Sequence, residues 1–288
     1  MERALAGPAA ARLGRRRRIG QRLVLAYHNV VPAGTAAGGD CSLHLDFDDF
    51  RRQLDALRQA RVVSLETALN PSIGDPVVAI TFDDAYASAV TLALPELAAR
   101  GFPSTMFVAP GLLDQGMPWW DRLAAGGEVP EAVRLRCLQV LGGEPPRIER
   151  EMGGAMPDRL DPELSIVSHE QLRHAATLPG ITFGSHTWSH PNLSRQNEPS
   201  LGSELRRPLE WLRATFPAIT RPWVAYPYGL FTSGVEEAAR AVGYEAGFAV
   251  TGGWSGKSDR PMALPRLNIP SGLSVEGFRA RIAGLLSL

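Results

Sequence analysis

The sequence has little of several features that mark particular classes of protein. Its 288 residues contain two cysteines, Cys41 and Cys137, which lie far apart in unlike contexts, so we expect no disulfide framework. No apolar run approaches the ~20 residues of a membrane-spanning helix. The N-terminal residues also lack the long apolar core of a signal peptide. We therefore expect no transmembrane segment and a cytoplasmic location.

An excess of either charge is also missing. Thirty basic and thirty acidic side chains cancel, so the overall field gives no reason to expect a nucleic-acid partner. The exception is the run Arg15–Arg18, which we interpret as part of a solvated tail, with weak contact to an anionic surface as the alternative. No aromatic residues interrupt it, which argues against binding single-stranded nucleic acid. We expect residues 1–20 to be a disordered extension and residues 21–288 to form one folded domain.

Apolar runs that read as strands alternate with amphipathic segments that read as helices. This alternation predicts an α/β fold with a parallel sheet, either doubly wound or closed into a barrel. Residues 111–165, rich in glycine, proline and charge, interrupt it and are predicted to be one long insertion. The expected strands are 22–30, 76–82, 103–109, 180–185, 223–227 and 245–250, and the expected helices are 46–61, 88–101, 168–180, 200–216, 233–243 and 274–286.

Four polar clusters follow expected strands at the point where each strand ends. They are centred on His28, on Asp83 and Asp84, on His186 and His190, and on Tyr226, Tyr228 and Gly229. In a parallel barrel these strand ends share one rim, where active sites are built. The coincidence of four clusters carries more weight than any one of them.

Two neighbouring aspartates at a strand end require an explanation, because like charges raise each other's pKa. Asp84, His186 and His190 together would make a three-ligand cation site with open positions, which is typical of catalytic zinc. The cation would offset the repulsion between Asp83 and Asp84. Asp83 could then take a proton from the water that the metal activates. Taken singly, the aspartates could cap a helix, and the histidines could cap backbone groups in a loop.

Three motifs resemble those of carbohydrate esterase family 4, the NodB-homology polysaccharide deacetylases. They are "TFDDAY", "GSHTWSHPNLS" and "AYPYG", in the order of that family, and the resemblance extends over about residues 22–285. It implies a distorted (β/α)7 barrel whose members remove N-acetyl, and sometimes O-acetyl, groups from sugars. It also implies one divalent metal ion, Zn²⁺ by preference with Co²⁺, Ni²⁺ or Mn²⁺ as alternatives. The expected substrate is an N-acetylated sugar polymer or oligosaccharide, and the expected products are acetate and a free amine.

The resemblance also assigns roles by position. Asp83 corresponds to the catalytic base, and Asp84, His186 and His190 to the metal ligands. The backbone N–H of Tyr228 is expected to help hold the oxyanion, an interaction that contributes about 3–4 kcal/mol in other enzymes.

The chain departs from the family pattern at three places. Ala85 stands where the family usually has glycine, which matters only if its φ is positive. The usual late Leu-x-His motif is missing, and the arginine of the third motif is not in its normal place. The exopolysaccharide and poly-N-acetylglucosamine deacetylases carry an early Tyr-His that resembles "LAYHNVV", so His28 is the candidate general acid. Arg266 is the candidate partner of Asp83, with Arg221 as the alternative.

Some residues and functions stay open at this point. Trp119, Trp120 and Asp121 could form a sugar-stacking platform or could pin the insertion to the barrel. His44 has no identifiable partner. Two histidines and a carboxylate also form the site of non-haem iron oxygenases, and the same fold could be an O-acetyl esterase or a catalytically silent carbohydrate-binding protein. The extra aspartate and the Tyr-Pro-Tyr-Gly motif favour the amidohydrolase.

Overall fold

The computed structural model describes residues 18–35, 38–70, 72, 74–124, 127–153, 162–256 and 258–284. The predicted disordered extension, residues 1–20, lies outside them as far as residue 17, as do Arg15, Arg16 and Arg17. Arg18 is described. Its guanidinium donates a hydrogen bond of 3.0 Å to the Gly284 carbonyl and lies 4.7 Å from the centre of the Trp254 ring. This arginine therefore contacts its own chain.

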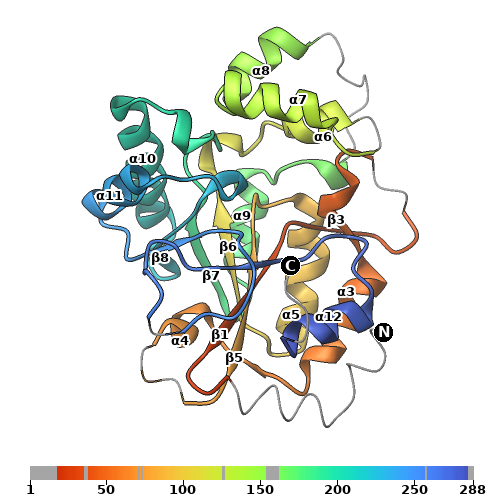
Figure 1. The fold of residues 1–288 in the computed structure, drawn as a ribbon. Coiled ribbons are helices and arrows are strands. Elements are labelled where there is room, and N and C mark those ends of the chain that lie inside the picture. Colours follow the sequence, from red (N-terminus) through yellow and green to blue (C-terminus); the bar gives the residue numbers. More distant parts are fainter. Residues whose placement is uncertain are drawn as a thin grey trace.

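Parallel strands form the centre of the protein (Figure 1). In spatial order the main path is β10 (Leu267–Asn268), β1 (Arg22–Tyr27), β5 (Val77–Phe82), β6 (Ser104–Val108), β7 (Ile181–Ser185), β8 (Thr220–Ala225) and β9 (Ala246–Phe248), and β4 (Arg61–Val62) pairs with β5. Every residue of β5 and β6 is buried, as expected for strands covered on both faces. A separate small sheet pairs β2 (Asn29–Val31) with β3 (His44–Asp46).

The two ends of the strand path meet through an irregular segment. The N–H of Gly247 in β9 donates to the Pro261 carbonyl at 2.9 Å, and the N–H of Leu264 donates back to Gly247 at 2.8 Å. The same segment continues into β10, which pairs with β1. The sheet is thus curled and closed without a regular last ladder, which confirms the distorted (β/α)7 barrel class.

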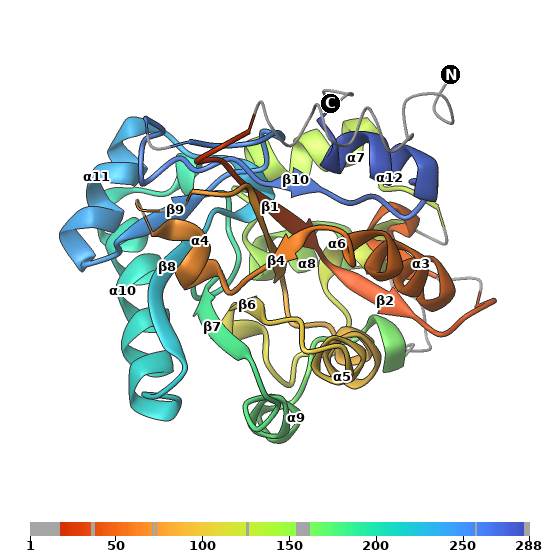
Figure 2. The ribbon, with the colours of Figure 1, turned by 90° about the horizontal axis from the view of Figure 1, so that it is seen from below.

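Helices cover the outside of the strands (Figure 2). Segments far apart in sequence supply them: α3 (Phe47–Leu57), α4 (Leu65–Leu69), α5 (Leu94–Ala99), α9 (His169–Ala175), α10 (Glu198–Thr215), α11 (Ser233–Val242) and α12 (Val275–Ile282). The apolar face of α3 buries Phe50, Leu54 and Leu57. No helix in the part of the chain that the structure describes is long and apolar enough to cross a membrane.

The helix expected over 88–101 has two parts. A π-helical stretch, Ala89–Ala93, precedes α5. Pro95 explains the break, because proline has no N–H to donate to the carbonyl four residues earlier. The local solution is an i→i−5 bond from the Leu94 N–H to Ala89, the pattern of a π-bulge.

The described part of the expected insertion is largely helical. It contains α6 (Trp119–Ala124), α7 (Glu131–Leu135) and α8 (Pro145–Met152). These three helices lie together at one end of the strands (Figure 1). Residues of this segment contact the polar clusters that follow β5, β7 and β8.

Candidate active site

The predicted site residues meet at the carboxyl ends of the strands. Asp83 follows β5 directly, and its backbone N–H donates to the Tyr27 carbonyl at 2.9 Å. The next two residues, Asp84 and Ala85, have φ values of 69° and 62°. The left-handed turn directs Asp84 into the site. It also explains why glycine is usual at position 85, because alanine is strained at positive φ by about 1–2 kcal/mol.

Asp84, His186 and His190 bring three potential ligand atoms together. The Asp84 Oδ1 atom lies 3.2 Å from the His190 Nε2 atom and 3.5 Å from the His186 Nε2 atom. The two Nε2 atoms lie 3.0 Å apart. All three residues are at least 97% buried. Among the described residues, this is the one group with the spacing of a metal site.

The surrounding hydrogen bonds favour one tautomer for each histidine. The Nδ1 atom of His186 faces the Ala225 carbonyl at 2.8 Å, and a carbonyl can only accept, so this nitrogen carries the proton. The Tyr228 hydroxyl lies 3.2 Å from the His190 carbonyl, to which it donates, and 3.1 Å from the His190 Nδ1 atom. The hydroxyl oxygen therefore accepts from Nδ1–H. In both rings these contacts place the proton on Nδ1 by inference, so that Nε2 presents a lone pair to the site.

These contacts fit a cation. The Asp84 Oδ1 atom is buried and has no hydrogen-bond partner, and two nitrogen lone pairs face it. Three acceptors without a proton between them repel one another, and an uncompensated buried oxygen is costly. A divalent ion bound by one carboxylate and two imidazoles would satisfy all three, and outer contacts of this kind are typical of metal-ligating histidines.

The pKa directions agree with this interpretation. Burial raises the pKa of Asp84 well above its usual range, and the negative charges of Asp83 and Asp121 raise it further. Burial lowers the pKa of His186. Burial and the neighbouring His186 both lower the pKa of His190. At neutral pH the imidazoles are therefore neutral, as ligation requires. Asp84 needs a nearby positive charge to remain ionised.

Arg266, and not Arg221, is the partner of Asp83. Burial alone would raise the pKa of Asp83, but the charge and hydrogen bonds of Arg266 bring it well below its usual range. The Arg266 side chain is fully buried, with its guanidinium 5.2 Å from the centre of the Phe107 ring. Arg221 instead pairs with Glu66 near the surface, at 3.3 Å.

His28 lies between β1 and β2 and belongs to the same site. Burial lowers its pKa to about 4, although the Asp83 carboxylate opposes this effect, and the positive charge of Arg266 adds to it. The imidazole is therefore neutral at pH 7. Any proton that it gives to a substrate must reach it during the reaction.

The tryptophans of the insertion pack against the site. The Trp120 ring centre lies 4.7 Å from that of His190, and the Trp119 indole N–H donates to the Tyr228 hydroxyl at 3.2 Å. Both tryptophans are only 3% exposed, which leaves no open face for a sugar. Of the two interpretations, the structure supports pinning of the insertion to the barrel.

Asp121 is the centre of a buried network that sequence reasoning missed. Its Oδ1 atom accepts hydrogen bonds from His44 Nε2 at 2.9 Å and from the Asp40 N–H at 2.8 Å. Its Oδ2 atom accepts from the Tyr86 hydroxyl at 2.6 Å, and that hydroxyl accepts from the Trp120 indole at 2.7 Å. His44 thus has a partner 77 residues away, and no local sequence pattern predicts that pairing.

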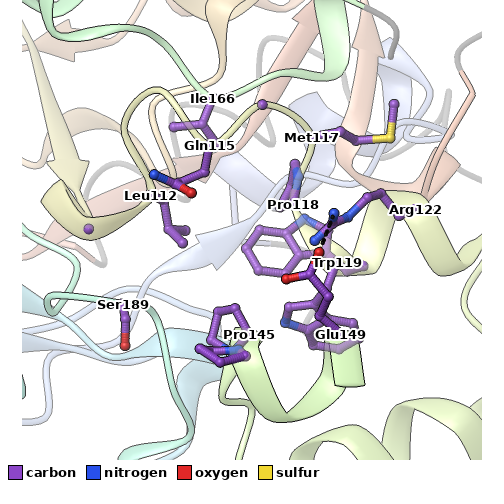
Figure 3. A pocket seen from close by; sticks show the side chains of 14 residues that line it. Leu112, Gln115, Met117, Pro118, Trp119, Arg122, Pro145, Glu149, Ile166 and Ser189 are labelled. Atoms are coloured by element: carbon purple, nitrogen blue, oxygen red, sulfur yellow. Dashed lines mark ion pairs between the residues drawn. The ribbon is translucent and has the colours of Figure 1, made fainter. Parts of the chain in front are cut away.

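A small hollow of about 210 Å³ lies beside the candidate site (Figure 3). Trp119, Pro145 and Ser189 are among its lining residues, and Arg122 forms an ion pair of 3.6 Å with Glu149 there. None of the predicted metal ligands or catalytic residues lines it. The hollow is therefore separate from the reacting centre, although Ser189 adjoins His190.

Three comparisons with known proteins bear on this site. A family model described as polysaccharide deacetylase matches residues 71–247, which is more than half of the chain. The match confirms the resemblance inferred from the three motifs and the expectation of a deacetylase that acts on carbon–nitrogen amide bonds. The comparison with curated proteins finds no match.

Several solved structures share the fold. The Streptococcus pyogenes deacetylase PplD, solved with acetate, is 20% identical with a TM-score of 0.65, over 91% of this chain and 98% of that one. IcaB from Ammonifex degensii is 22% identical with a TM-score of 0.63, over 92% and 98%. A de-N-acetylase from Aggregatibacter actinomycetemcomitans is 18% identical with a TM-score of 0.64, over 90% and 98%. The motifs, the strand-end site and the family match lead to one conclusion: the chain belongs to the polysaccharide deacetylase family.

Proposed function

We propose that this protein is a metal-dependent hydrolase that removes N-acetyl groups from the amino sugars of a polysaccharide or oligosaccharide. The observation that carries the proposal is the arrangement of Asp84, His186 and His190, whose three proton-free acceptor atoms converge beside an ionised Asp83. The Asp83 Oδ2 atom lies 3.9 Å from the His186 Nε2 atom. A base and a cation site are thus adjacent, as hydrolysis of an amide requires.

The ligand set suits an ion of the zinc class. One carboxylate and two imidazoles leave positions open for water and substrate, and Co²⁺, Ni²⁺ and Mn²⁺ are alternatives for the same donors. When bound, such an ion polarises a carbonyl and makes water more acidic by several orders of magnitude.

Asp83 is proposed to take the proton of the attacking water. Its pairing with Arg266 keeps the carboxylate ionised and fixes its orientation. The same pairing makes Asp83 a weak base, because its pKa lies well below neutral pH. Proton uptake by Asp83 therefore depends on a water that has been made acidic.

Tyr228 is proposed to stabilise the oxyanion that forms when water adds to the amide, and His28 is proposed to protonate the nitrogen that leaves. Tyr228 has a φ of 58°, a conformation that turns its backbone, and its N–H is the proposed donor to the oxyanion. His28 starts neutral and is proposed to relay a proton to the departing nitrogen. Water adds to the acetamide carbon, the C–N bond breaks, and acetate and a free amine leave.

Two rivals predict different results. The same residues could cleave an O-acetyl ester, which needs no strong acid for its leaving alcohol. The Aggregatibacter relative, a de-N-acetylase, supports the amide. An iron oxygenase would not need Asp83, whereas here a fully buried arginine is paired with that aspartate.

The test is acetate release from matched N-acetylated and O-acetylated oligosaccharides by wild type, Asp83→Asn and His28→Ala. We expect release from the N-acetylated substrate, loss of release in Asp83→Asn, and a fall of about 10²–10⁴-fold in His28→Ala. Release from the O-acetylated substrate alone would contradict the proposed bond. Unchanged amide hydrolysis in His28→Ala would contradict the role of His28.

The cytoplasmic location is likewise a proposal, tested by fractionating cells that make the protein.

A further inference from the structure

The loop that carries both histidine ligands is strained. Thr187 and His190 have φ values of 67° and 61°, and neither is a glycine. Non-glycine residues in this region cost about 1–3 kcal/mol each unless their surroundings hold them. Inside the loop, the Thr187 N–H donates to Ser185 Oγ and the His190 N–H to Thr187 Oγ1, both at 3.1 Å. The two residues between them need support from elsewhere.

Glu204 of α10 supplies that support. Its Oε2 atom accepts hydrogen bonds from the backbone N–H groups of Trp188, at 3.0 Å, and Ser189, at 2.8 Å. Its Oε1 atom accepts from the Ser189 hydroxyl, at 2.8 Å. One carboxylate thus binds the two residues that precede His190 in the loop. Bonds to a charged acceptor are the stronger kind.

Pro208 makes a further contact available. In a regular α-helix the carbonyl of residue 204 accepts from the N–H of residue 208, but Pro208 lies inside α10 and has no N–H. The Glu204 carbonyl instead shares the Trp188 N–H with Oε2 and accepts from it at 3.1 Å. The spacing of Glu204 and Pro208 therefore presents both a carboxylate and a carbonyl to the same loop.

Other contacts hold Trp188 in place. The Arg207 guanidinium lies 3.9 Å from the centre of the Trp188 ring. The Gly111 N–H donates to the Trp188 carbonyl at 2.8 Å. A Cβ atom at position 111 would lie 2.7 Å from that carbonyl oxygen, so the approach requires glycine. The loop is thus fixed by α10 together with the residues that follow β6.

We infer that Glu204 and Pro208 are positioning residues that hold His186 and His190 in the geometry that binds the metal ion. Neither residue is among the metal ligands or the residues proposed to act on the substrate. Their contribution is to keep the strained loop in one conformation, so that the two Nε2 atoms stay 3.0 Å apart. The inference rests on the proposed function only in requiring that the site binds a metal ion.

The test measures binding of Co²⁺ and Zn²⁺ by the full chain, by calorimetry and by the visible absorption of bound Co²⁺. We expect Glu204→Ala to lower affinity about 10–100-fold, the range for residues that orient metal ligands, and to alter the Co²⁺ spectrum. The metal affinity of Glu204→Gln should stay within about threefold of that of wild type. Its amide oxygen can still accept both N–H bonds, and the Ser189 hydroxyl can turn to accept from the amide nitrogen.

Pro208→Ala separates positioning from general stability. The new N–H competes for the Glu204 carbonyl, so we expect metal affinity to fall about 3–10-fold. The melting temperature of the metal-free protein should not fall by more than about 3 °C, because alanine is the better helix residue. Glu210→Ala is the matched control, an exposed glutamate on the same helix, and should bind metal as wild type does.

The outcomes separate this inference from the proposed function. If wild type binds no divalent ion, the proposed function fails. If wild type binds one, equal affinity in Glu204→Ala overturns the inference. So does a Glu204→Gln variant that is as defective as Glu204→Ala, because then the hydrogen bonds are not what matters.

Discussion

The Arg266 guanidinium forms two parallel hydrogen bonds with Asp83, each 2.7 Å long, from Nη1 to Oδ1 and from Nη2 to Oδ2. Both side chains are buried, and they join segments 183 residues apart in the sequence. Two-point pairing of this kind fixes the plane of the carboxylate as well as its charge. The orientation of the proposed base therefore depends on a residue that lies directly before β10, the last strand in the sequence.

Replacing Arg266 should damage both stability and activity. In Arg266→Met the Asp83 carboxylate is left buried without its partner, which costs about 3–5 kcal/mol in the free energy of unfolding. Arg266→Lys keeps the charge but loses the two-point contact, so kcat should fall at least about tenfold with a smaller loss of stability. Urea unfolding and acetate release measure the two effects.

The pH dependence of the Arg266→Met defect follows from the sign of the Asp83 shift. The folded-state pKa of Asp83 lies below its unfolded value, so this carboxylate stabilises the fold above about pH 4 and loses that effect as the pH falls. The stability gap between wild type and Arg266→Met should therefore narrow below about pH 4. A gap that is the same at pH 3 and pH 7 would contradict the assignment.

His28 should make the metal-free protein sensitive to mild acid. Its folded pKa of about 4 lies below the ordinary value of 6.5. The stability due to neutral His28 is therefore complete above about pH 6.5 and is lost as the pH falls toward 4. Between pH 7 and pH 5, the unfolding free energy of wild type should fall by about 2 kcal/mol more than that of His28→Gln. Urea unfolding of both proteins in chelator checks this, and parallel losses would contradict it.

Removing Asp121 should loosen the insertion. Asp121→Ala leaves His44, Tyr86 and the Asp40 N–H without their common acceptor, at about 1–3 kcal/mol for each unsatisfied buried group. We expect a total loss of about 3–5 kcal/mol in unfolding free energy, because such costs are not fully additive. Glu128→Ala, an exposed change in the same insertion, should shift stability by less than about 0.5 kcal/mol. If Asp121→Ala lowered the unfolding free energy as little as Glu128→Ala does, that result would contradict the role of the network.

The sequence was most informative where apolar runs end in polar residues. The runs before Asp83 and His186 predict buried strands, and parallel strands necessarily bring those residues to one rim. The pairing of His44 with Asp121 could not be predicted, because it depends on how the insertion folds back onto β3. Nor could the sequence choose between Arg266 and Arg221, since Arg221 is the second residue of β8 and Arg266 lies directly before β10, so each stands at the amino end of a strand.

Backbone conformation was another limit. Ala85 and Thr187 are ordinary residues for a strand or loop, and nothing in their identity reveals a positive φ. Pro208 reads as a helix breaker, yet α10 continues through it and presents the freed carbonyl to the Trp188 N–H. Such features become visible only when the tertiary contacts that hold them are known.

Asp84, His186 and His190 are proposed to hold a divalent ion that amide hydrolysis requires. The most direct measurement is acetate release from an N-acetylated oligosaccharide while Zn²⁺ is titrated into metal-depleted protein, with bound metal counted in parallel. We predict no release without metal, full release at about one ion per chain, and loss of both binding and release in His190→Ala. Release that is undiminished in fully metal-depleted protein would contradict the account.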